Sequence, residues 1–508
     1  MGSQLTTSRR QFLRLAIAGA AGTALLAACG GAAPAPTAAP AATTAPKPVE
    51  AAKPTEAPKP AAEAPKPAAT NTPAPVGQQM MPGLKEFGGA AVPKPVAKME
   101  GDLILWHNWG NTQGGGLGMI DLIDEFTKLY PQVKVTNVFD ADQQKFLAAI
   151  ASGNVPDLQK LDAWNLPSLG ARGALVALDD YIARDKVDMT QFFDFAVDQT
   201  SWAGKVYAIT HHPDIRCIFT AQDILKEVGL DPEATPKSWD DLMAWGTKMS
   251  KKEGGRYTRF GFVPAWTANP WPTQYMLANG AALISEDGRK ATFETDEAVE
   301  ALDWALKATD EVCGGRDNTV EFQEAFKTAQ GSGAYWMFPQ NRMGMVHNGN
   351  WFWMPITIVN PTMKVKNATF PGGPRQKGKE FVFGGGTMVS IFKGAKHQDL
   401  AWEWLKFLGS EEGGYLVQIR TTDVSGHRKA ANDPRIVDKN LGRKQILPLF
   451  EKANAKAYLK SPIAQQFDTE MTRLGDRVLT KEMPIKQALT EAVKATQKAL
   501  DDWWASVK

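Results

Sequence analysis

Apolar and polar positions of the chain follow the period of a strand and that of a helix in turn, beginning near residue 102. The first predicted elements are a strand at 102–106, a helix at 119–126, a strand at 133–139 and a helix at 143–151. A glycine-rich turn at 114–116 precedes the first helix, and Pro131 ends it. Strand, helix, strand and helix in this order predict an α/β lobe with a mainly parallel sheet.

The same mixture continues to the end of the chain. We expect short strands at 205–209 and 215–220, helices at 295–310, 320–327 and 400–408, and amphipathic helical patterns at 471–474 and 488–504. Ser238 is expected to cap the helix that follows it, with Asp241 in the reciprocal capping position. About 400 residues can therefore form a globular α/β body.

The first residues have the layout of an export signal. Arg9 and Arg10 precede an apolar run at 15–28, which is too short to span a membrane as a mature helix, and the paired arginines resemble the twin-arginine type of signal. The run ends in Leu26-Ala27-Ala28-Cys29, which resembles a bacterial lipobox. We predict a signal peptide at 1–28 and lipidation of Cys29; the alternative is an ordinary signal in which Cys29 is incidental.

Residues 29–100 are rich in Ala-Pro and Lys-Pro units, for example Ala57-Pro58-Lys59-Pro60. Proline removes backbone donors and favours extended conformations, so we predict a solvated spacer between a lipid anchor and the folded body. The expected location is the outer face of the cytoplasmic membrane, extracellular or periplasmic.

Charge and cysteine content exclude several classes. Lys and Arg number 57 against 55 Asp and Glu, and removal of Arg9, Arg10 and Arg14 leaves 54 against 55, a net charge of −1. Such a balance supplies no field for a polyanion, so we expect no nucleic-acid partner. Cys217 and Cys313 could pair, but they form no disulfide framework and are predicted to be small buried hydrophobes.

Catalytic and cofactor signatures are missing. The glycines at 114–118 do not form GxGxxG, and the sequence contains no GxxxxGK[ST], GxSxG or HExxH. His211 and His212 are adjacent on a predicted strand, where side chains point to opposite faces, so we expect no metal site. Asp162 and Asp214 could act as a glycosidase pair, but a sequence does not set their separation. We expect no enzyme and no cofactor.

The positions of the tryptophans are the most informative candidate chemistry. Trp109, Trp164, Trp266 and Trp271 fall in or beside loops rich in Gly, Pro and Asn, whereas Trp239, Trp245, Trp304, Trp402 and Trp404 fall within helical patterns and are predicted to be core. Loop tryptophans beside Asn108, Asp162, Asn165 and Asn269 offer flat faces next to planar hydrogen-bonding groups, the combination that a sugar ring requires. The alternative is that the loop tryptophans plug the core.

The chain resembles the bacterial extracellular solute-binding proteins of carbohydrate ABC importers, the maltose-binding-protein-like family, over roughly residues 101–480. The motifs that carry the resemblance are Leu105-Trp106-His107-Asn108-Trp109, Ser152-Gly153-Asn154-Val155-Pro156-Asp157-Leu158, Gly204-Lys205-Val206-Tyr207-Ala208-Ile209, Pro236-Lys237-Ser238-Trp239-Asp240-Asp241-Leu242, Gly344-Met345-Val346-His347-Asn348-Gly349-Asn350-Trp351, and Lys393-Gly394-Ala395-Lys396-His397 leading into Ala401-Trp402-Glu403-Trp404-Leu405.

The resemblance implies a two-lobed periplasmic-binding-protein-like fold of type II, with hinged lobes and mostly parallel central sheets. Lobe 1 would comprise residues 101–212 and 352–408, and lobe 2 residues 213–351 and 409–508. The ligand residues carried over by position are Asn108, Trp109, Asp162, Trp164, Gly385 and Gly386 from lobe 1, and Asp214, Trp266, Trp271, Trp351 and Arg428 from lobe 2.

The resemblance further implies a monomeric binding lipoprotein that captures a mono- or oligosaccharide and delivers it to the permease subunits of an ABC importer. Two alternatives remain. One is an exported hydrolase or cofactor-dependent enzyme. The other is a binding protein for a peptide, a phosphorylated polyol or an anion, which Arg216, Arg428 or His212 in the cleft would favour.

Overall fold

The computed structural model describes residues 99–110, 114–139, 141, 143–265, 271–326, 336–438, 441–452 and 459–506. The predicted signal peptide, Cys29, the spacer and Trp266 lie outside this part of the chain. No described helix combines the length and apolarity needed to cross a membrane.

The first half of the described chain contains short helices between strands. Its elements are β1 (Gly101–Trp106), α2 (Gly114–Leu129), β2 (Val133–Val138), α3 (Gln143–Ser152), β3 (Leu158–Asp162), α4 (Leu166–Ala171), α5 (Asp179–Asp185), α6 (Asp194–Gln199), β4 (Ser201–Trp202), β5 (Lys205–Val206), β6 (Ala208–Ala221), α7 (Gln222–Glu227), α8 (Trp239–Met249), β7 (Lys251–Glu253), β8 (Arg256–Phe262), α9 (Trp271–Ala278), α10 (Asp296–Cys313) and α11 (Arg316–Ala325).

The second half ends in long helices. Its elements are β9 (Met343–Gly349), α13 (Trp353–Val359), β10 (Val365–Ala368), β11 (Phe370–Pro371), β12 (Glu380–Phe381), β13 (Phe383–Ile391), α14 (Gln398–Leu408), α15 (Glu411–Ile419), α16 (Arg428–Ala431), α17 (Pro434–Val437), α18 (Leu441–Phe450), α19 (Ala464–Leu479) and α20 (Ile485–Ser506), with single 3₁₀ turns at Met189–Gln191, Asn350–Phe352 and Pro374–Gln376.

Within the described residues, the main sheet has nine strands in the order β2-β1-β3-β13-β6-β9-β8-β7, and β10 pairs with β6. The pairs β1–β2, β1–β3 and β8–β9 are parallel, whereas β13 and β6 run antiparallel to their neighbours. The expectation of a mainly parallel sheet is therefore correct for β1 to β3 and wrong for the sheet as a whole, which is mixed. Strand β6 runs from the first of two hydrophobic cores to the second, and β13 runs back in the opposite direction beside it.

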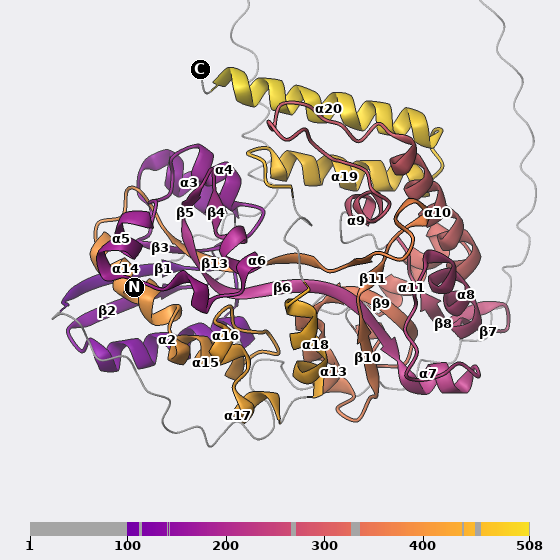
Figure 1. Cartoon of the computed structure of the whole chain (residues 1–508), viewed down its shortest axis with the longest axis horizontal. Coiled ribbons are helices and arrows are strands. Elements are labelled where there is room, and N and C mark those ends of the chain that lie inside the picture. The colour runs from indigo at the N-terminus through magenta and orange to yellow at the C-terminus, as the bar shows by residue number, and fades with distance from the viewer. Residues whose placement is uncertain are drawn as a thin grey trace, which may run out of the picture. The chain divides into compact units, whose positions relative to one another are not determined.

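Two hydrophobic cores lie along this sheet, and β6 and β13 contribute to both. Ala208 and Ile209 of β6 belong to the first core. Ile215, Phe219 and Ala221 of the same strand belong to the second core. Strand β13 likewise places Phe383 in the second core and Val389 in the first. In Figure 1, β6 runs as one long ribbon from the region of α6 to that of α7. Two short strands were expected at 205–209 and 215–220. Residues 208–221 instead form one strand, and Lys205–Val206 form the separate strand β5.

The helical tryptophans behave as predicted. Trp239, Trp304, Trp402 and Trp404 are buried, and Trp245 is half-buried against the second core. The Ser238 hydroxyl accepts a hydrogen bond from the Asp241 backbone amide at 3.1 Å, as predicted. The Asp241 carboxylate, however, accepts a hydrogen bond from the backbone amide of Lys237 and not from that of Ser238. Cys217 and Cys313 are buried and unpaired, as predicted.

Candidate functional site

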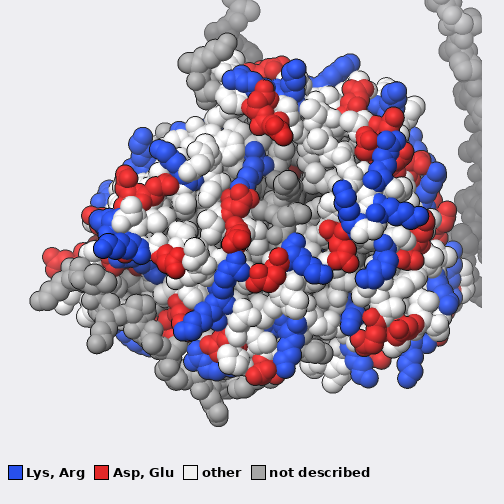
Figure 2. All heavy atoms as spheres, in the orientation of Figure 1, with Lys and Arg blue, Asp and Glu red and all other residues white. Residues whose placement is uncertain are grey.

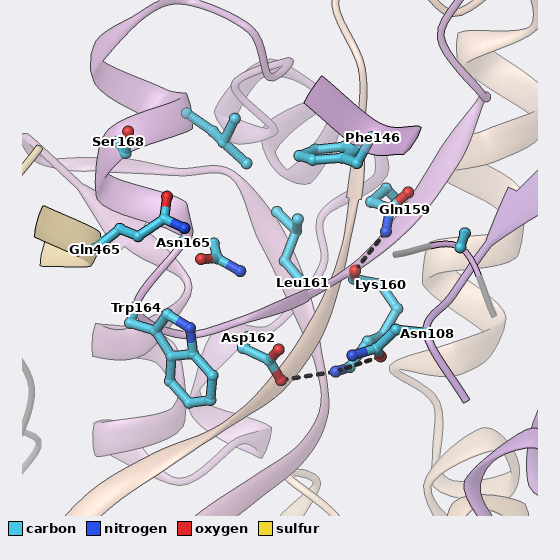
Figure 3. Close-up of a pocket in the computed structure, with 12 residues that line it drawn as sticks. Asn108, Phe146, Gln159, Lys160, Leu161, Asp162, Trp164, Asn165, Ser168 and Gln465 are labelled. Carbon is cyan, nitrogen blue, oxygen red and sulfur yellow. Dashed lines mark hydrogen bonds and ion pairs between the residues drawn. The ribbon is translucent and has the colours of Figure 1, made fainter. Parts of the chain in front are cut away.

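A cavity of about 240 Å³ lies where β1 and β3 end, and α19 faces it from another part of the chain (Figure 3). Asn108 follows β1, Asp162 ends β3, and Trp164 and Asn165 lead into α4. The carboxyl ends of parallel strands share one edge of a sheet, so β1 and β3 bring these polar residues together. Gln465, the first turn of α19, completes the lining.

Lys160 connects the polar groups of the cavity. Its ammonium donates to the Asp162 carboxylate at 2.7 Å and to the Asn108 side-chain oxygen at 3.0 Å. The Lys160 side chain is only 3% exposed, against 20% for Asp162. Lys160 and Asp162 lie two positions apart on one strand, so their side chains share a face. The pair cancels its own charge and leaves the rest of the carboxylate as a hydrogen-bond acceptor.

Trp164 is half-buried and its indole borders the cavity beside Asp162 (Figure 3). Asn165 stands at the N-cap of α4, yet its side chain makes no capping hydrogen bond, and its amide points into the cavity in Figure 3. Gln465 approaches Asn165 from α19 in the same view. An indole face, a carboxylate and three amides are the groups that bind the C–H face and the hydroxyl edge of a polyhydroxylated ring.

Trp109 lies against protein groups. The Lys160 ammonium lies 4.9 Å from the ring centroid, and the His212 ring is stacked on it at 5.9 Å with an interplanar angle of 25°. A Cβ at Gly115 would come within 2.7 Å of the indole. The Trp109 indole therefore packs between Lys160 of β3 and His212 of β6, and it does not line the cavity.

The two adjacent histidines share one side of β6, contrary to the expectation of opposite faces. Thr387 pairs with His212 and Met388 with Thr210, so His211 is the extra residue of a β-bulge. The bulge brings the Nδ1 atoms of His211 and His212 to 2.7 Å from each other. Burial lowers the pKa of both rings, that of His212 to about 3, and the nearby Lys160 charge lowers them further. Both rings are therefore neutral at pH 7, and one ring nitrogen donates to the other.

Gly386 explains how Pro213 fits in the middle of a central strand. Pro213 has no N–H, and it pairs with Gly386, whose φ is +130°. A Cβ at Gly386 would lie 2.6 Å from the His212 oxygen and 2.7 Å from the Asp214 nitrogen. Gly386 thus serves close strand approach, and neither it nor Gly385 lines the cavity.

A second polar group lies farther along β6. The Arg216 guanidinium contacts the Asp214 carboxylate at 3.1 Å and lies 5.7 Å from the Trp351 ring centroid. Burial raises the pKa of Asp214 to about 6, although Arg216 and the Trp351 indole oppose that shift. Asp214 and Trp351 are thus neighbours, but neither of these predicted ligand residues lines the cavity.

Asp423 faces the histidine pair from the loop after α15. Its Oδ2 atom lies 3.6 Å from His212 Nε2, and burial raises its pKa to about 6 while the buried Arg443 opposes the shift. Trp109 therefore lies against both Lys160 and His212, and Asp423 lies next to His212.

Two predicted ligand residues lie elsewhere. Trp271 begins α9 and is 4% exposed in the second core, where its ring meets Tyr275. The Arg428 guanidinium contacts Asp194, Glu451 and the Phe192 carbonyl, so it ties α16 to neighbouring segments instead of lining the cavity. Among the predicted residues, the cavity contains Asn108, Asp162 and Trp164.

Sequence reasoning missed Lys160 and Gln465 as lining residues. A lysine between Leu158 and Leu161, two positions before an aspartate, was a usable signal for Lys160, because a buried cation needs a partner on its own face. No local signal identifies Gln465, which lies some three hundred positions later in the sequence. Within the described ranges no group of three or more His, Cys, Asp or Glu could hold a metal ion.

Together, the fold and the cavity define a class: a binding protein of the type II periplasmic fold, with a candidate site beside the strands that cross between two cores. The pattern of the family described as bacterial extracellular solute-binding protein matches residues 109–415, and the chain belongs to this family.

Similar proteins agree with this assignment. The arabinooligosaccharide-binding protein of Bacillus subtilis is 25% identical over 305 residues, which are 58% of this chain and 66% of the relative, just under two thirds of its length. The diacetylchitobiose binding protein DasA of Streptomyces coelicolor is 24% identical over 70% of this chain and 77% of the relative. A solved structure with mannobiose bound has a TM-score of 0.67 and 23% identity, and it covers 78% of this chain and 99% of its own.

Proposed function

We propose that the protein is a non-enzymatic receptor that captures an uncharged sugar in the cavity at the end of β3 and delivers it to the permease of an ABC importer. The observation that carries the proposal is the set of groups in that cavity: the Trp164 indole, an Asp162 carboxylate balanced by Lys160, and the amides of Asn108, Asn165 and Gln465. The names of the relatives, which bind arabinooligosaccharide and diacetylchitobiose, support this class of ligand.

The energetics of such a site suit a neutral polyhydroxylated ligand. Stacking on one indole contributes about 1 kcal/mol beyond area burial. Each hydroxyl that donates to a carboxylate contributes about 1.5 to 3 kcal/mol, more than one that donates to a neutral amide. Neither interaction requires a charge on the ligand, and Lys160 is already paired with Asp162.

Closure around the ligand completes the proposal. The two lobes would rotate about β6 and β13, because these two strands belong to both cores. In this division, lobe 1 comprises residues 101–212 and 352–408, and lobe 2 comprises residues 213–351 and 409–508. Tyr415, Leu416 and Val417 nevertheless pack in the first core, although the proposed division places residues 409 onward in lobe 2. Phe352, Val365 and Phe370 likewise pack in the second core, although the division places residues 352–408 in lobe 1. Asp162 and Gln465 come from different lobes in this division, so a ligand that contacts both would favour the closed state.

The anchoring of the protein is part of the same proposal. A lipidated Cys29 and the proline-rich spacer at 29–100 would hold a monomeric receptor at the outer face of the cytoplasmic membrane, close to its permease. On the face shown in Figure 2, acidic and basic side chains are interspersed, in agreement with a receptor that has no polyanionic partner.

Calorimetry with mannobiose, arabinobiose, diacetylchitobiose and maltose tests the proposal. We expect at least one sugar to bind the wild type, and Trp164→Ala to weaken it by about tenfold because stacking and apolar contact are lost together. Trp504→Ala is the matched control, since that half-buried indole donates to the Gly288 carbonyl away from the cavity. Equal affinity in the wild type and in Trp164→Ala would refute the assignment of the cavity, and a bound nucleotide in native mass spectrometry would favour an enzyme.

A further inference from the structure

The Lys160–Asp162 pair is the feature of the cavity that the function proposed above leaves unexplained. Binding of a neutral sugar calls for acceptors and a flat surface, and a buried lysine in a strand is expensive because its charge is removed from water. Among the described residues that line the cavity, Lys160 and Asp162 are the only charged ones. We therefore ask what Lys160 does to the groups that contact its ammonium.

Three groups meet the Lys160 ammonium. They are the Asp162 carboxylate at 2.7 Å, the Asn108 amide oxygen at 3.0 Å and the Trp109 ring at 4.9 Å from its centroid. Asn108 follows β1 and Asp162 ends β3, so a single side chain joins the loops after two neighbouring strands. Asn108 accepts this hydrogen bond at its amide oxygen, which leaves the donor function of the amide to its NH₂ group.

The charges of the pair also decide which ligands are admitted. Asp162 is paired with Lys160, the only cation among the described residues that line the cavity. An anionic ligand would therefore meet a neutral pair and a carboxylate oxygen that repels it. Without the carboxylate charge, the same ammonium would have only neutral partners, such as the Asn108 oxygen and the Trp109 ring, and an anion could pair with it.

We propose that Lys160 is a positioning and specificity-determining residue: it holds Asp162 and Asn108 in the orientation that receives sugar hydroxyls, and its pairing with Asp162 makes the cavity reject anions. This inference rests on the proposed function for the sugar and extends it to the basis of selectivity. Lys160 does not contact the sugar in this scheme, and its effect on sugar affinity passes through Asp162.

A double-mutant cycle tests the positioning role. Calorimetry with mannobiose, arabinobiose and diacetylchitobiose would compare the wild type with K160M, D162N and the double variant. We expect each single variant to lose about tenfold or more in affinity, and the double variant to lose no more than the worse single one, because both changes remove the same arrangement. K160R, which keeps the charge, should recover affinity to within about threefold of the wild type. Losses that multiply in the double variant would overturn the positioning role.

An anion titration tests the selectivity separately. We expect sn-glycerol 3-phosphate to bind D162N measurably and to bind neither the wild type nor the double variant, because only D162N has an unpaired Lys160. Absence of binding to D162N, or equal binding to the double variant, would overturn the selectivity claim. If no sugar binds the wild type, the proposed function fails, while this titration still decides whether Asp162 masks Lys160.

A half-buried, paired lysine outside the cavity provides the control for stability. Lys406 pairs with Asp185 and Glu403 and its side chain is 19% exposed. K406M should lower the unfolding temperature without changing sugar affinity. If K160M does not fold, K160R and D162N still test the inference, since neither leaves the strand without a polar side chain at its position.

Discussion

His212 provides a prediction whose size follows from the structure. Its ring is 8% exposed, between Trp109, His211 and Thr387, and burial lowers its pKa from 6.5 to about 3. The unfolded chain therefore binds a proton at His212 between pH 6.5 and 3 that the folded chain does not bind. The stabilisation by neutral His212 is complete above pH 6.5 and is lost as the pH falls through this window.

The size of this loss depends on how far the pH lies below the ordinary pKa of His212. At pH 5, 1.5 pH units below the unfolded value, His212 lowers the free energy of unfolding by about 2 kcal/mol relative to pH 7. Asp214 and Asp423 act in the opposite direction. Their folded pKa of about 6 exceeds the ordinary 3.8, so the folded state gains stability as the pH falls through that interval. The total pH dependence is therefore a sum of opposing contributions, and a variant is needed to isolate one.

His212→Gln removes the titrating ring and keeps a neutral side chain that can donate and accept. Urea unfolding at pH 7 and pH 5 should show that the variant loses about 2 kcal/mol less than the wild type between these two values. His397→Gln, which removes an exposed ring, is the control, and the wild-type difference between the two pH values should persist in it. If His212→Gln and the wild type lose the same free energy within about 0.5 kcal/mol, His212 is not kept neutral by the fold.

Three further predictions concern other parts of the chain. Gly386→Ala should lower the free energy of unfolding by roughly 2 kcal/mol or more, because a Cβ there meets the backbone of β6 at a φ of +130°; a smaller loss in urea unfolding would show that β13 shifts freely. Arg172→Ala should weaken sugar binding about two- to fivefold in calorimetry, since Arg172 after α4 lies over the Trp503 ring of α20 at 5.4 Å and joins the two proposed lobes; unchanged affinity would mean that this contact does not favour closure. Cys29→Ser should abolish labelling by radioactive palmitate and release the protein from the membrane fraction, whereas an unaltered membrane fraction would contradict the lipid anchor.

Local pattern predicted much of the fold. The strands at 102–106 and 133–139 and the first two helices appear within a few residues of their expected bounds, apart from the additional turns of α2, because alternating and helical periods encode which face is buried. Helical tryptophans at core spacing are in the core for the same reason. The local pattern failed at Pro213, where we expected a break between two strands; a bulge at His211 and the missing side chain of Gly386 let one strand continue.

The candidate site was predicted in part. Asn108, Asp162 and Trp164 lie in loops directly after strands β1 and β3, and their positions at the strand ends are local features that a sequence displays. Trp271 and Trp164 look alike in sequence, since both stand beside turn-forming residues. Their difference in burial comes from α19, whose Gly475 packs on the Trp271 indole.

The amino-acid sequence by itself determined the order and type of the first four elements, the near-neutral charge, the absence of common catalytic signatures and the resemblance to solute-binding proteins. Only the tertiary structure decided that Gln465 joins Asp162 at one cavity, that His211 and His212 share a side, and that Lys160 is paired. The physical reason is that periodicity reports the burial of each element separately. Contacts between distant segments depend on strand register and helix packing, which the whole chain sets at once.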